Sequence, residues 1–478
     1  MKINRGGNDE IKKGIKDIKS TYYSIKNPDK LLVFLNDKLK PSEKAKNERG
    51  EVFTPLELVN EMLDKLPSEV WANPNLKWLD PATGIGNFPV MVYLRLMNGL
   101  KYFEPNPEKR RKHILEQMLY MVELDKLNVY LLKKVFCENA YKLNIFEGSF
   151  IKETNNKKVD ILFGDKPMKK KENLEFEKKV EKIKEFDIIL GNPPFQDTNE
   201  NGKRKAQNHN LWTIFLSYSY QLLKKNGYLL LITPTSWMSP TFNENKYIFY
   251  KNWLIFLNIN ECKKWFPSVG SNFSYYLIQK TNQKKDTFVI CKYNKQNYKS
   301  KLLLDDNIEF IPSLLTKESL SIIKKFYNND IDKISFETSN ELHRDNKKEF
   351  IGECNKKYIY PIRHTTKNKN LCSSIQHTLF NKNKILLNLS GDLDPLYDDG
   401  KLGITQAQMF LLTNKKKYVN ILNSKLYKFI FKICKWSGFN ILSIFKEIPF
   451  IIENKTDEEL YKIFKLTKDE IKLINEMI

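Results

Sequence analysis

The sequence predicts a doubly wound α/β domain followed by a mixed α+β domain. In the first half of the chain, short apolar runs alternate with segments of helical period, a pattern typical of βαβ units and a parallel sheet with helices on both faces. In the second half this alternation stops. With 478 residues the chain is long enough for two or three domains. We expect an N-terminal helical extension over residues 1–44, the α/β domain over 45–285 and the mixed domain over 286–478.

The expected strands are short and mostly apolar, and they come in the order 77–80, 119–125, 143–146, 186–191 and 228–234. Helical periodicity fills residues 88–100, 126–136 and 212–227, and Gly227 is expected to close the last of these helices. Ligands of open parallel sheets bind at the carboxyl ends of the strands. The loops that follow the strands are therefore the places where chemistry is expected.

The balance of charge favours a polyanionic partner. The formal net charge is +23, and basic residues bind nucleic acid by neutralising phosphates and releasing counterions. Genome composition is an alternative explanation, because abundant Lys, Asn and Ile are also typical of proteins from AT-rich genomes. We treat the charge as support for nucleic-acid binding and not as proof of it.

Signals for export or membrane insertion are missing from the sequence. The first residues have no apolar core of the kind that a signal peptide needs, and no later stretch is apolar enough to cross a membrane. We expect a cytoplasmic protein, in a prokaryotic cell or a virus-infected host, with no membrane partner.

The six cysteines form no CxxC pair, so the sequence indicates neither a zinc ribbon nor a disulfide framework. Four possible metal ligands share one region, but their spacing matches no zinc module: Cys354, His364, Cys372 and His377. We expect reduced, partly buried thiols and no metal.

The first informative loop follows the strand that ends at Asp80. It reads Asp80-Pro81-Ala82-Thr83-Gly84-Ile85-Gly86-Asn87-Phe88. Gly84 and Gly86 permit a tight turn and let a ligand approach the backbone. The loop lacks the glycine pattern of a phosphate site, and the acid at its start would repel a phosphate. Asp80 suits a cationic ligand that carries an ammonium or a sulfonium.

The next strand ends at Glu123, with Asp125 two residues later. A carboxylate at the tip of the second strand is placed to accept the ribose hydroxyls of a nucleoside cofactor. A solvated acid is the alternative for both residues, and it weighs more for Asp125.

The most informative feature is Asn192-Pro193-Pro194-Phe195, directly after the strand at 186–191. Neither proline can donate to a ladder, so the Asn192 amide oxygen and the Pro193 carbonyl are left as acceptors at the edge of the sheet. Two acceptors can polarise an exocyclic amine, and Phe195 offers a face on which a flipped base can stack. Asn-Pro and Pro-Pro are also common turn formers, so the tetrapeptide alone leaves an ordinary strand exit open.

Together, these motifs resemble the gamma-class adenine-N6 DNA methyltransferases of restriction–modification systems, the N6 adenine-specific DNA methylases. The resemblance includes Gly50-Glu51-Val52-Phe53-Thr54-Pro55 before an amphipathic helix, and Trp265-Phe266-Pro267 after the catalytic motif. It implies a Rossmann-like domain that binds S-adenosyl-L-methionine, followed by a DNA target-recognition domain over 286–478.

The resemblance also assigns roles to single residues. Val52 and Thr54 would contact the methionine part of the cofactor. The methionine and its amino group would be held by Asp80, Ala82, Gly84 and Gly86. Glu123 would bind the ribose, and Leu124 one face of the cofactor's adenine. Phe195 and Phe266 would sandwich the target base, with a core position as the alternative for Phe266.

One element departs from the family pattern. Members usually carry an Asp at the end of the third strand, where this chain has Ser149-Phe150. A serine accepts a weaker hydrogen bond than a carboxylate does. Either Ser149 holds the cofactor's adenine less tightly, or Asp165 takes over that contact.

The expected function is methyl transfer to N6 of a flipped adenine in a specific duplex DNA sequence. Methylation of RNA, of protein glutamine or of cytosine N4 remains open, as does a catalytically decayed DNA-binding protein. The residues before Val52 are too few for a nuclease domain, so any cognate restriction endonuclease would be a separate protein. Four basic residues are candidate DNA contacts: Arg344, Arg363, His364 and Lys384.

Overall fold

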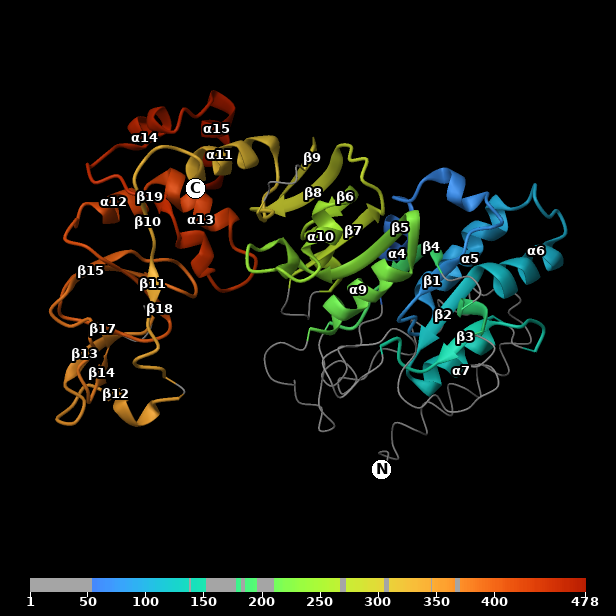
Figure 1. The fold of residues 1–478 in the computed structure, drawn as a ribbon, viewed down its shortest axis with the longest axis horizontal. Coiled ribbons are helices and arrows are strands. Elements are labelled where there is room, and N and C mark those ends of the chain that lie inside the picture. The colour runs from blue at the N-terminus through green and yellow to red at the C-terminus, as the bar shows by residue number, and fades with distance from the viewer. Residues whose placement is uncertain are drawn as a thin grey trace.

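The computed structural model describes residues 54–136, 139–151, 178–181, 185–195, 210–266, 272–304, 309–344, 346–365 and 370–478. Two parts lie side by side in Figure 1: a large sheet with its helices, and a smaller part built from short strands and helices. Val52 and Asp165 lie outside the described residues. None of the described helices is both long and apolar enough to span a membrane.

The large sheet has nine strands in the order β3-β2-β1-β4-β5-β7-β6-β8-β9. Its first five strands are parallel, as predicted: β1 (Trp78–Asp80), β2 (Leu119–Glu123), β3 (Asn144–Glu147), β4 (Phe186–Gly191) and β5 (Leu223–Pro234). From β1 the chain moves to one side through β2 and β3, then returns to pair β4 on the other side of β1. The strand order therefore reverses between β1 and β4, the point at which such sheets bind ligands.

Four more strands continue the sheet beyond β5: β6 (Trp253–Asn258), β7 (Phe273–Gln279), β8 (Thr287–Tyr293) and β9 (Gln296–Leu302). The strand β7 lies antiparallel between β5 and β6, while β8 and β9 form the outer edge. The sheet thus runs on to Leu302, past residue 285, where the sequence interpretation ends the domain.

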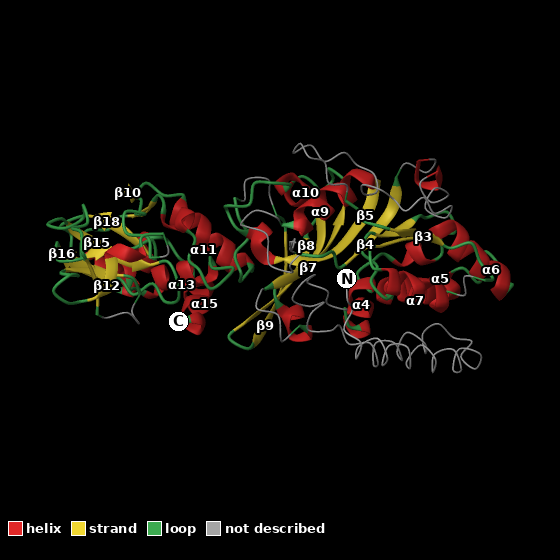
Figure 2. Cartoon of the chain, turned by 90° about the horizontal axis from the view of Figure 1, so that it is seen from below, coloured by secondary structure: helices red, strands yellow, loops and turns green. Residues whose placement is uncertain are grey.

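Helices cover both faces of the large sheet (Figure 2). One face carries α4 (Leu56–Leu63), α5 (Asn87–Gly99) and α7 (Lys126–Val135), and the other carries α9 (Leu211–Leu222) and α10 (Lys246–Tyr250). Successive residues of β4 point to opposite faces: Ile188 and Leu190 belong to the core under α4, α5 and α7, and Ile189 to the core under α9 and α10. Burial on both faces explains why these strands read as continuous apolar runs. The helix α6 (Pro107–His113) precedes β2.

The helix predicted over 212–227 is too long, because α9 ends at Leu222 and Gly227 lies within β5. Asn226, with φ of 64°, donates its backbone N–H to the carbonyl of Lys280 at 2.8 Å. Lys280 returns a backbone hydrogen bond to Gly227 at 3.0 Å. Pairing with the chain after β7 therefore overrides the helical period of this segment.

The smaller part contains three short sheets. These sheets have the orders β10-β19, β11-β18-β15-β16 and β12-β14-β13-β17. The strands are β10 (Lys333–Ile334), β11 (Glu337–Thr338), β12 (Ile351–Glu353), β13 (Tyr360–Arg363), β14 (Leu371–Ser373), β15 (Asn383–Asn388), β16 (Leu396–Asp399), β17 (Gly403–Ile404), β18 (Gln408–Leu412) and β19 (Ile448–Pro449). Its helices are α11 (Lys317–Tyr327), α12 (Tyr418–Leu422), α13 (Lys425–Ile433), α14 (Asp457–Ile463) and α15 (Lys468–Met477).

The two parts are joined by a continuous apolar core and by hydrogen bonds around Trp436. Its indole Nε1 donates to the carbonyl of Ile311 at 2.8 Å, and the N–H of Ile311 donates to the carbonyl of Met238, just after β5, at 2.8 Å. Trp436 is 4% exposed. The second part is thus packed against the end of a strand of the large sheet.

The expectation that all cysteines are reduced is wrong for two of them. Cys354, just after β12, forms a disulfide with Cys372 of β14. The antiparallel pairing of β12 with β14 places Cys372 opposite Gly352, two residues before Cys354. The two histidines of the same region hydrogen-bond to hydroxyls, His364 to Thr405 and His377 to Ser339. A spacing argument could not foresee a pairing that depends on the strand register.

Candidate active site

The carboxyl ends of β1 and β4 lie next to each other at the reversal point of the sheet. Leu79 of β1 pairs with Ile189 of β4, which brings Asp80 close to Gly191. Gly191 has a φ of 153°, and a Cβ added there would lie 2.9 Å from Asp80 Oδ1. Only a glycine at this position lets the two strand ends approach each other.

Asp80 is a buried acid, 3% exposed. Its Oδ1 accepts a hydrogen bond from the N–H of Ala82 at 3.1 Å, and its buried Oδ2 accepts none from the described residues. Burial raises the pKa of Asp80 to about 8, the Ala82 hydrogen bond opposes this shift, and the charge of Glu123 adds to it. A buried carboxyl oxygen without a donor suits a ligand that brings its own positive donor.

The loop after β1 folds back over β2. Gly84 and Gly86 have φ values of 58° and 104°, a region that glycine adopts without penalty. The N–H of Thr83 donates to the carbonyl of Val122 at 3.0 Å, and that of Gly84 donates to Glu123 Oε2 at 2.7 Å. The two predicted cofactor motifs therefore touch in the folded chain.

Glu123 lies at the end of β2 and is 9% exposed. Its Oε1 accepts the N–H of Asp125 at 2.8 Å. Asp125 itself caps α7, because its Oδ1 accepts the N–H of Leu127 at 2.8 Å. Leu124 is 67% exposed beside it. Asp125 is thus a helix cap, whereas Glu123 and Leu124 remain at the strand end.

Thr54 connects the predicted catalytic motif with the predicted cofactor loop. Asn192 donates from Nδ2 to Thr54 Oγ1 at 3.2 Å. Asn87, at the start of α5, donates from Nδ2 to the Thr54 carbonyl at 2.7 Å. Thr54 and Asn87 are both buried. One threonine therefore contacts residues from two separate motifs.

Three phenylalanines pack beside the motif. The ring of Phe195 lies 5.1 Å from that of Phe273 in β7, and Phe266 meets Phe273 edge-on at 5.6 Å. Phe195 is partly exposed, whereas Phe266 is 5% exposed and belongs to the core. Phe273 thus contacts both of the aromatics that the sequence pairs across a base.

The remaining predicted cofactor residues lie after β3. Ser149 Oγ accepts the N–H of Ile151 at 3.1 Å. Phe150 is buried and packs on Phe215 and Tyr218 of α9, with ring centroids 5.3 and 6.3 Å away. The Phe150 side chain thus supports the core under α9.

Sequence reasoning missed three residues that shape this edge. Gly191 directly precedes Asn192 and Asn87 lies within the Asp80–Phe88 loop, so their place in these motifs could have identified them. Phe273 had no such signal, because only the pairing of β7 with β5 brings it to Phe195.

Of the four basic candidates for DNA contact, Lys384 is wrongly predicted. It is fully buried, and its Nζ pairs with Asp398 and donates to the carbonyl of Leu379. Arg363 is 9% exposed and bonds Asp394 Oδ2 at 2.9 Å, while His364 is 9% exposed. Only Arg344 is fully on the surface.

Comparison with known proteins finds a family match for part of this edge. Residues 117–266, which include β2, β4 and Asn192, match the Eco57I restriction-modification methylase family. An uncharacterized adenine-specific methylase of Mycoplasma pneumoniae is 27% identical over 367 residues, or 64% of this chain and 85% of that protein.

Two solved structures share the fold over most of the chain. A nuclease-deletion mutant of the Type ISP restriction-modification enzyme LlaGI, in complex with a DNA substrate mimic, has a TM-score of 0.53 and 14% identity. That likeness covers 91% of this chain and 56% of LlaGI, less than two thirds of the larger enzyme. The Type IIL restriction-modification enzyme MmeI, in complex with DNA, has a TM-score of 0.50 and 12% identity, over 90% of this chain and 70% of that one.

The sheet with its reversal point, the Asn192 motif and the family match agree with one another. Residues 117–266 are similar to the Eco57I restriction-modification methylase family, and the chain is a methyltransferase of the restriction–modification type.

Proposed function

We propose that this protein transfers the methyl group of S-adenosyl-L-methionine to N6 of an adenine that is flipped out of duplex DNA. The observation that carries the proposal is the Asn192 side chain, held by Thr54 beside the buried Asp80 at the reversal point of the sheet. In this proposal the amine-binding motif would lie next to a site that suits a cationic ligand.

The residues present fit the cofactor. The carboxyl of Asp80 would hold its amino group, because Oδ2 has no other donor among the described residues. Glu123 accepts the backbone N–H groups of Gly84 and Asp125 and the side-chain amide of Asn128, and its carboxylate at the end of β2 would bind the cofactor's ribose. Leu124, exposed at the strand end, would cover one face of the cofactor's adenine. Val52 and Ser149 remain proposed contacts.

Asn192 and Pro193 would act on the target amine. The Asn192 amide is oriented by donating Nδ2 to Thr54, so its Oδ1 and the Pro193 carbonyl would accept the two N6 hydrogens. This draws the nitrogen lone pair out of conjugation with the ring. The cofactor's sulfonium supplies an already activated methyl group. Transfer of that methyl group to N6 would leave the cofactor as a neutral sulfide, and N6 would lose one proton to water.

We assign base stacking to Phe195, whose ring is partly exposed. Phe266 would have to leave the core to face a base. We therefore propose that Phe266 instead packs against Phe273, which in turn packs on Phe195. Stacking on one aromatic face contributes about 1–3 kcal/mol, which offsets part of the cost of flipping.

The test is methyl transfer from tritiated S-adenosyl-L-methionine to duplex DNA, RNA or protein, followed by digestion of the labelled product. We expect label in N6-methyladenine from duplex DNA. Label in N4-methylcytosine, methylated RNA or methylglutamine, or no label, would each contradict the proposal. Asn192→Ala should abolish transfer and leave the Kd for the cofactor within about twofold, because the amide touches the amine and not the cofactor.

A further inference from the structure

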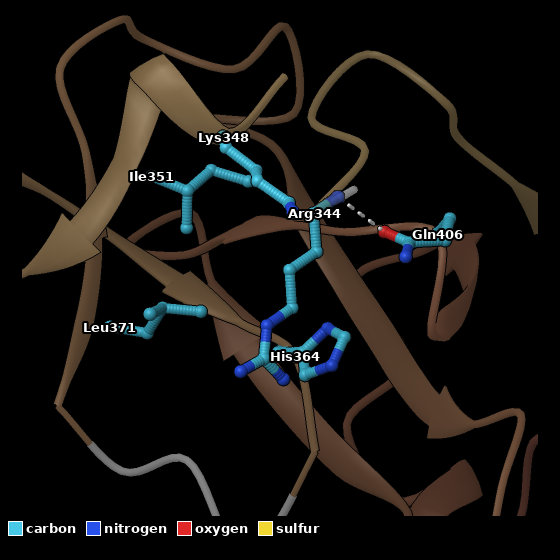
Figure 3. A pocket seen from close by; sticks show the side chains of 6 residues that line it. All are labelled: Arg344, Lys348, Ile351, His364, Leu371 and Gln406. Carbon is cyan, nitrogen blue, oxygen red and sulfur yellow. Dashed lines mark hydrogen bonds between the residues drawn. The ribbon is translucent and has the colours of Figure 1, made fainter. Parts of the chain in front are cut away.

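A pocket lies in the smaller part of the chain, outside the edge that holds Asn192. Its volume is about 600 Å³. The lining residues come from the four-stranded sheet β12-β14-β13-β17 and its loops: Arg344, Lys348, Ile351, His364, Leu371 and Gln406 (Figure 3).

The strand pairing explains why these residues meet. Parallel strands end at the same edge, and β13 pairs in parallel with β17 through Arg363 and Ile404. His364 and Gln406 therefore emerge there together. The backbone N–H of Arg344 donates to Gln406 Oε1 at 3.0 Å, which places the Arg344 loop over the same edge.

The opposite wall is held by two further links. Ser374 N–H donates to the carbonyl of Phe350 at 2.9 Å, at the end of the short 3₁₀ helix Lys348–Phe350. The disulfide between Cys354 and Cys372 ties the end of β12 to β14. Ile351 and Leu371 thus form an apolar wall that faces the polar groups.

Arg344, Lys348 and Gln406 offer donors to this pocket. Arg344 and Lys348 are exposed, and within the described part of the chain neither side chain forms an ion pair or a hydrogen bond. Gln406 already uses its Oε1 as an acceptor, which leaves the Nε2 donor. Among the described residues, no acidic side chain lines the pocket. In Figure 3 the Arg344 side chain extends across the pocket towards His364.

We propose that this pocket reads a guanine of the DNA that the enzyme methylates, with Arg344 as the residue that specifies it. The inference rests on the proposed function. In the major groove guanine presents two adjacent acceptors, O6 and N7, and a guanidinium presents two parallel donors to them. The Nε2 of Gln406 adds a third donor. Lys348 is placed at the rim to contact a phosphate.

An ordinary phosphate site is the main competitor. A phosphate accepts either an ammonium or a guanidinium, and it gains nothing from an apolar wall. The apolar side chains of Ile351 and Leu371 instead suit the flat rim of a base or its sugar. A phosphate site would tolerate replacement of Arg344 by lysine, which keeps the charge, whereas a guanine site would lose the two parallel donors it needs.

The test is selection of duplexes from a random-sequence library by the full chain without cofactor, so that its outcome does not depend on methyl transfer. The wild type should enrich a motif that contains a guanine. Arg344→Lys keeps the charge, and we expect it to lower the preference for one guanine by about 10- to 100-fold. Lys348→Ala should weaken binding to all sequences equally and reduce the salt dependence.

Lys356→Ala, which removes an exposed charge outside the pocket, is the matched control and should keep the wild-type motif. An unchanged motif in Arg344→Lys and Arg344→Ala would overturn the inference, as would uniform weakening by Arg344→Ala. A wild type that selects no sequence would overturn it too. A selected guanine without N6-methyladenine in the transfer assay would instead refute the proposed function alone. Circular dichroism checks that each variant is folded.

Discussion

Asn192 donates its side-chain Nδ2 to the hydroxyl of Thr54 at 3.2 Å, across 138 positions of sequence. This bond turns the Nδ2 end of the amide towards the threonine, and in the proposed function the Oδ1 end would accept the target amine. The carbonyl of the same threonine accepts a hydrogen bond from the side-chain amide of Asn87, in the predicted cofactor loop. Thr54 is therefore a positioning residue as well as a proposed cofactor contact.

Thr54→Val should lower kcat by about 10-fold, because a lost hydrogen bond of roughly 1.4 kcal/mol lets the Asn192 amide rotate. The hydrogen bond from the Asn87 side chain to the Thr54 carbonyl would remain. Thr54→Ser keeps the hydroxyl and should stay within about twofold of the wild type. Single-turnover methyl transfer at saturating cofactor measures both, and a wild-type rate in Thr54→Val would refute the positioning role.

Gly191→Ala should impair folding and activity together. Its φ of 153° is strained for a residue with a side chain, and the new Cβ would press on Asp80 Oδ1. Such backbone strain costs about 1–3 kcal/mol before the clash is counted. Urea denaturation measures the loss. The matched control is Gly438→Ala, where an added Cβ meets no atom within 4 Å, and equal losses in the two variants would contradict this explanation.

Asp80 should make the stability of the cofactor-free protein fall as the pH rises. Its pKa is about 8 in the folded chain, against the ordinary aspartate value of 3.8 that applies once the chain is unfolded. Between these values the folded state holds a proton that the unfolded state has lost, so stability is greatest at the acidic end and declines up to about pH 8. Asp80→Asn should flatten this slope in thermal denaturation. An equally steep slope in the variant would show that other groups cause it.

The same group should link cofactor affinity to pH. Only the ionised carboxylate can pair with the cofactor's amino group, so binding should strengthen as the pH is raised towards 8. Isothermal titration calorimetry should also detect proton release from Asp80 at pH 7. Asp80→Asn should bind more weakly and without this pH dependence below pH 8. Affinity that is independent of pH in the wild type would argue against the proposed contact.

Lys384→Met should destabilise the smaller part of the protein by about 3–5 kcal/mol, because it leaves Asp398 buried without its cation. Lys401→Met is a close control. Lys401 pairs with Asp399 at 2.9 Å on the surface, where solvent screens the charges, so no measurable change is expected. Urea denaturation followed by tryptophan fluorescence compares the two variants. A small effect of Lys384→Met would mean that Asp398 becomes hydrated or protonated at little cost.

The parallel half of the large sheet, and the strand ends that carry Asp80, Glu123 and Asn192, could be predicted because their signals are local. Apolar runs such as Phe186–Gly191 are buried on both faces, and the polar residues that follow mark the strand ends. The antiparallel strands β8 and β9 were assigned to the next domain. Which of their residues are buried depends on the strand with which they pair, and that pairing cannot be deduced from the sequence.

The sequence by itself determined the order of the strands along the chain, the positions of Asp80, Glu123 and Asn192 at strand ends, and the chemistry those side chains allow. Tertiary structure decided which of them meet. It paired Cys354 with Cys372, buried Lys384 against Asp398, and brought Phe273 into contact with both Phe195 and Phe266. These outcomes depend on strand register and on contacts between distant segments. Burial then changes what a charge or a ring can do.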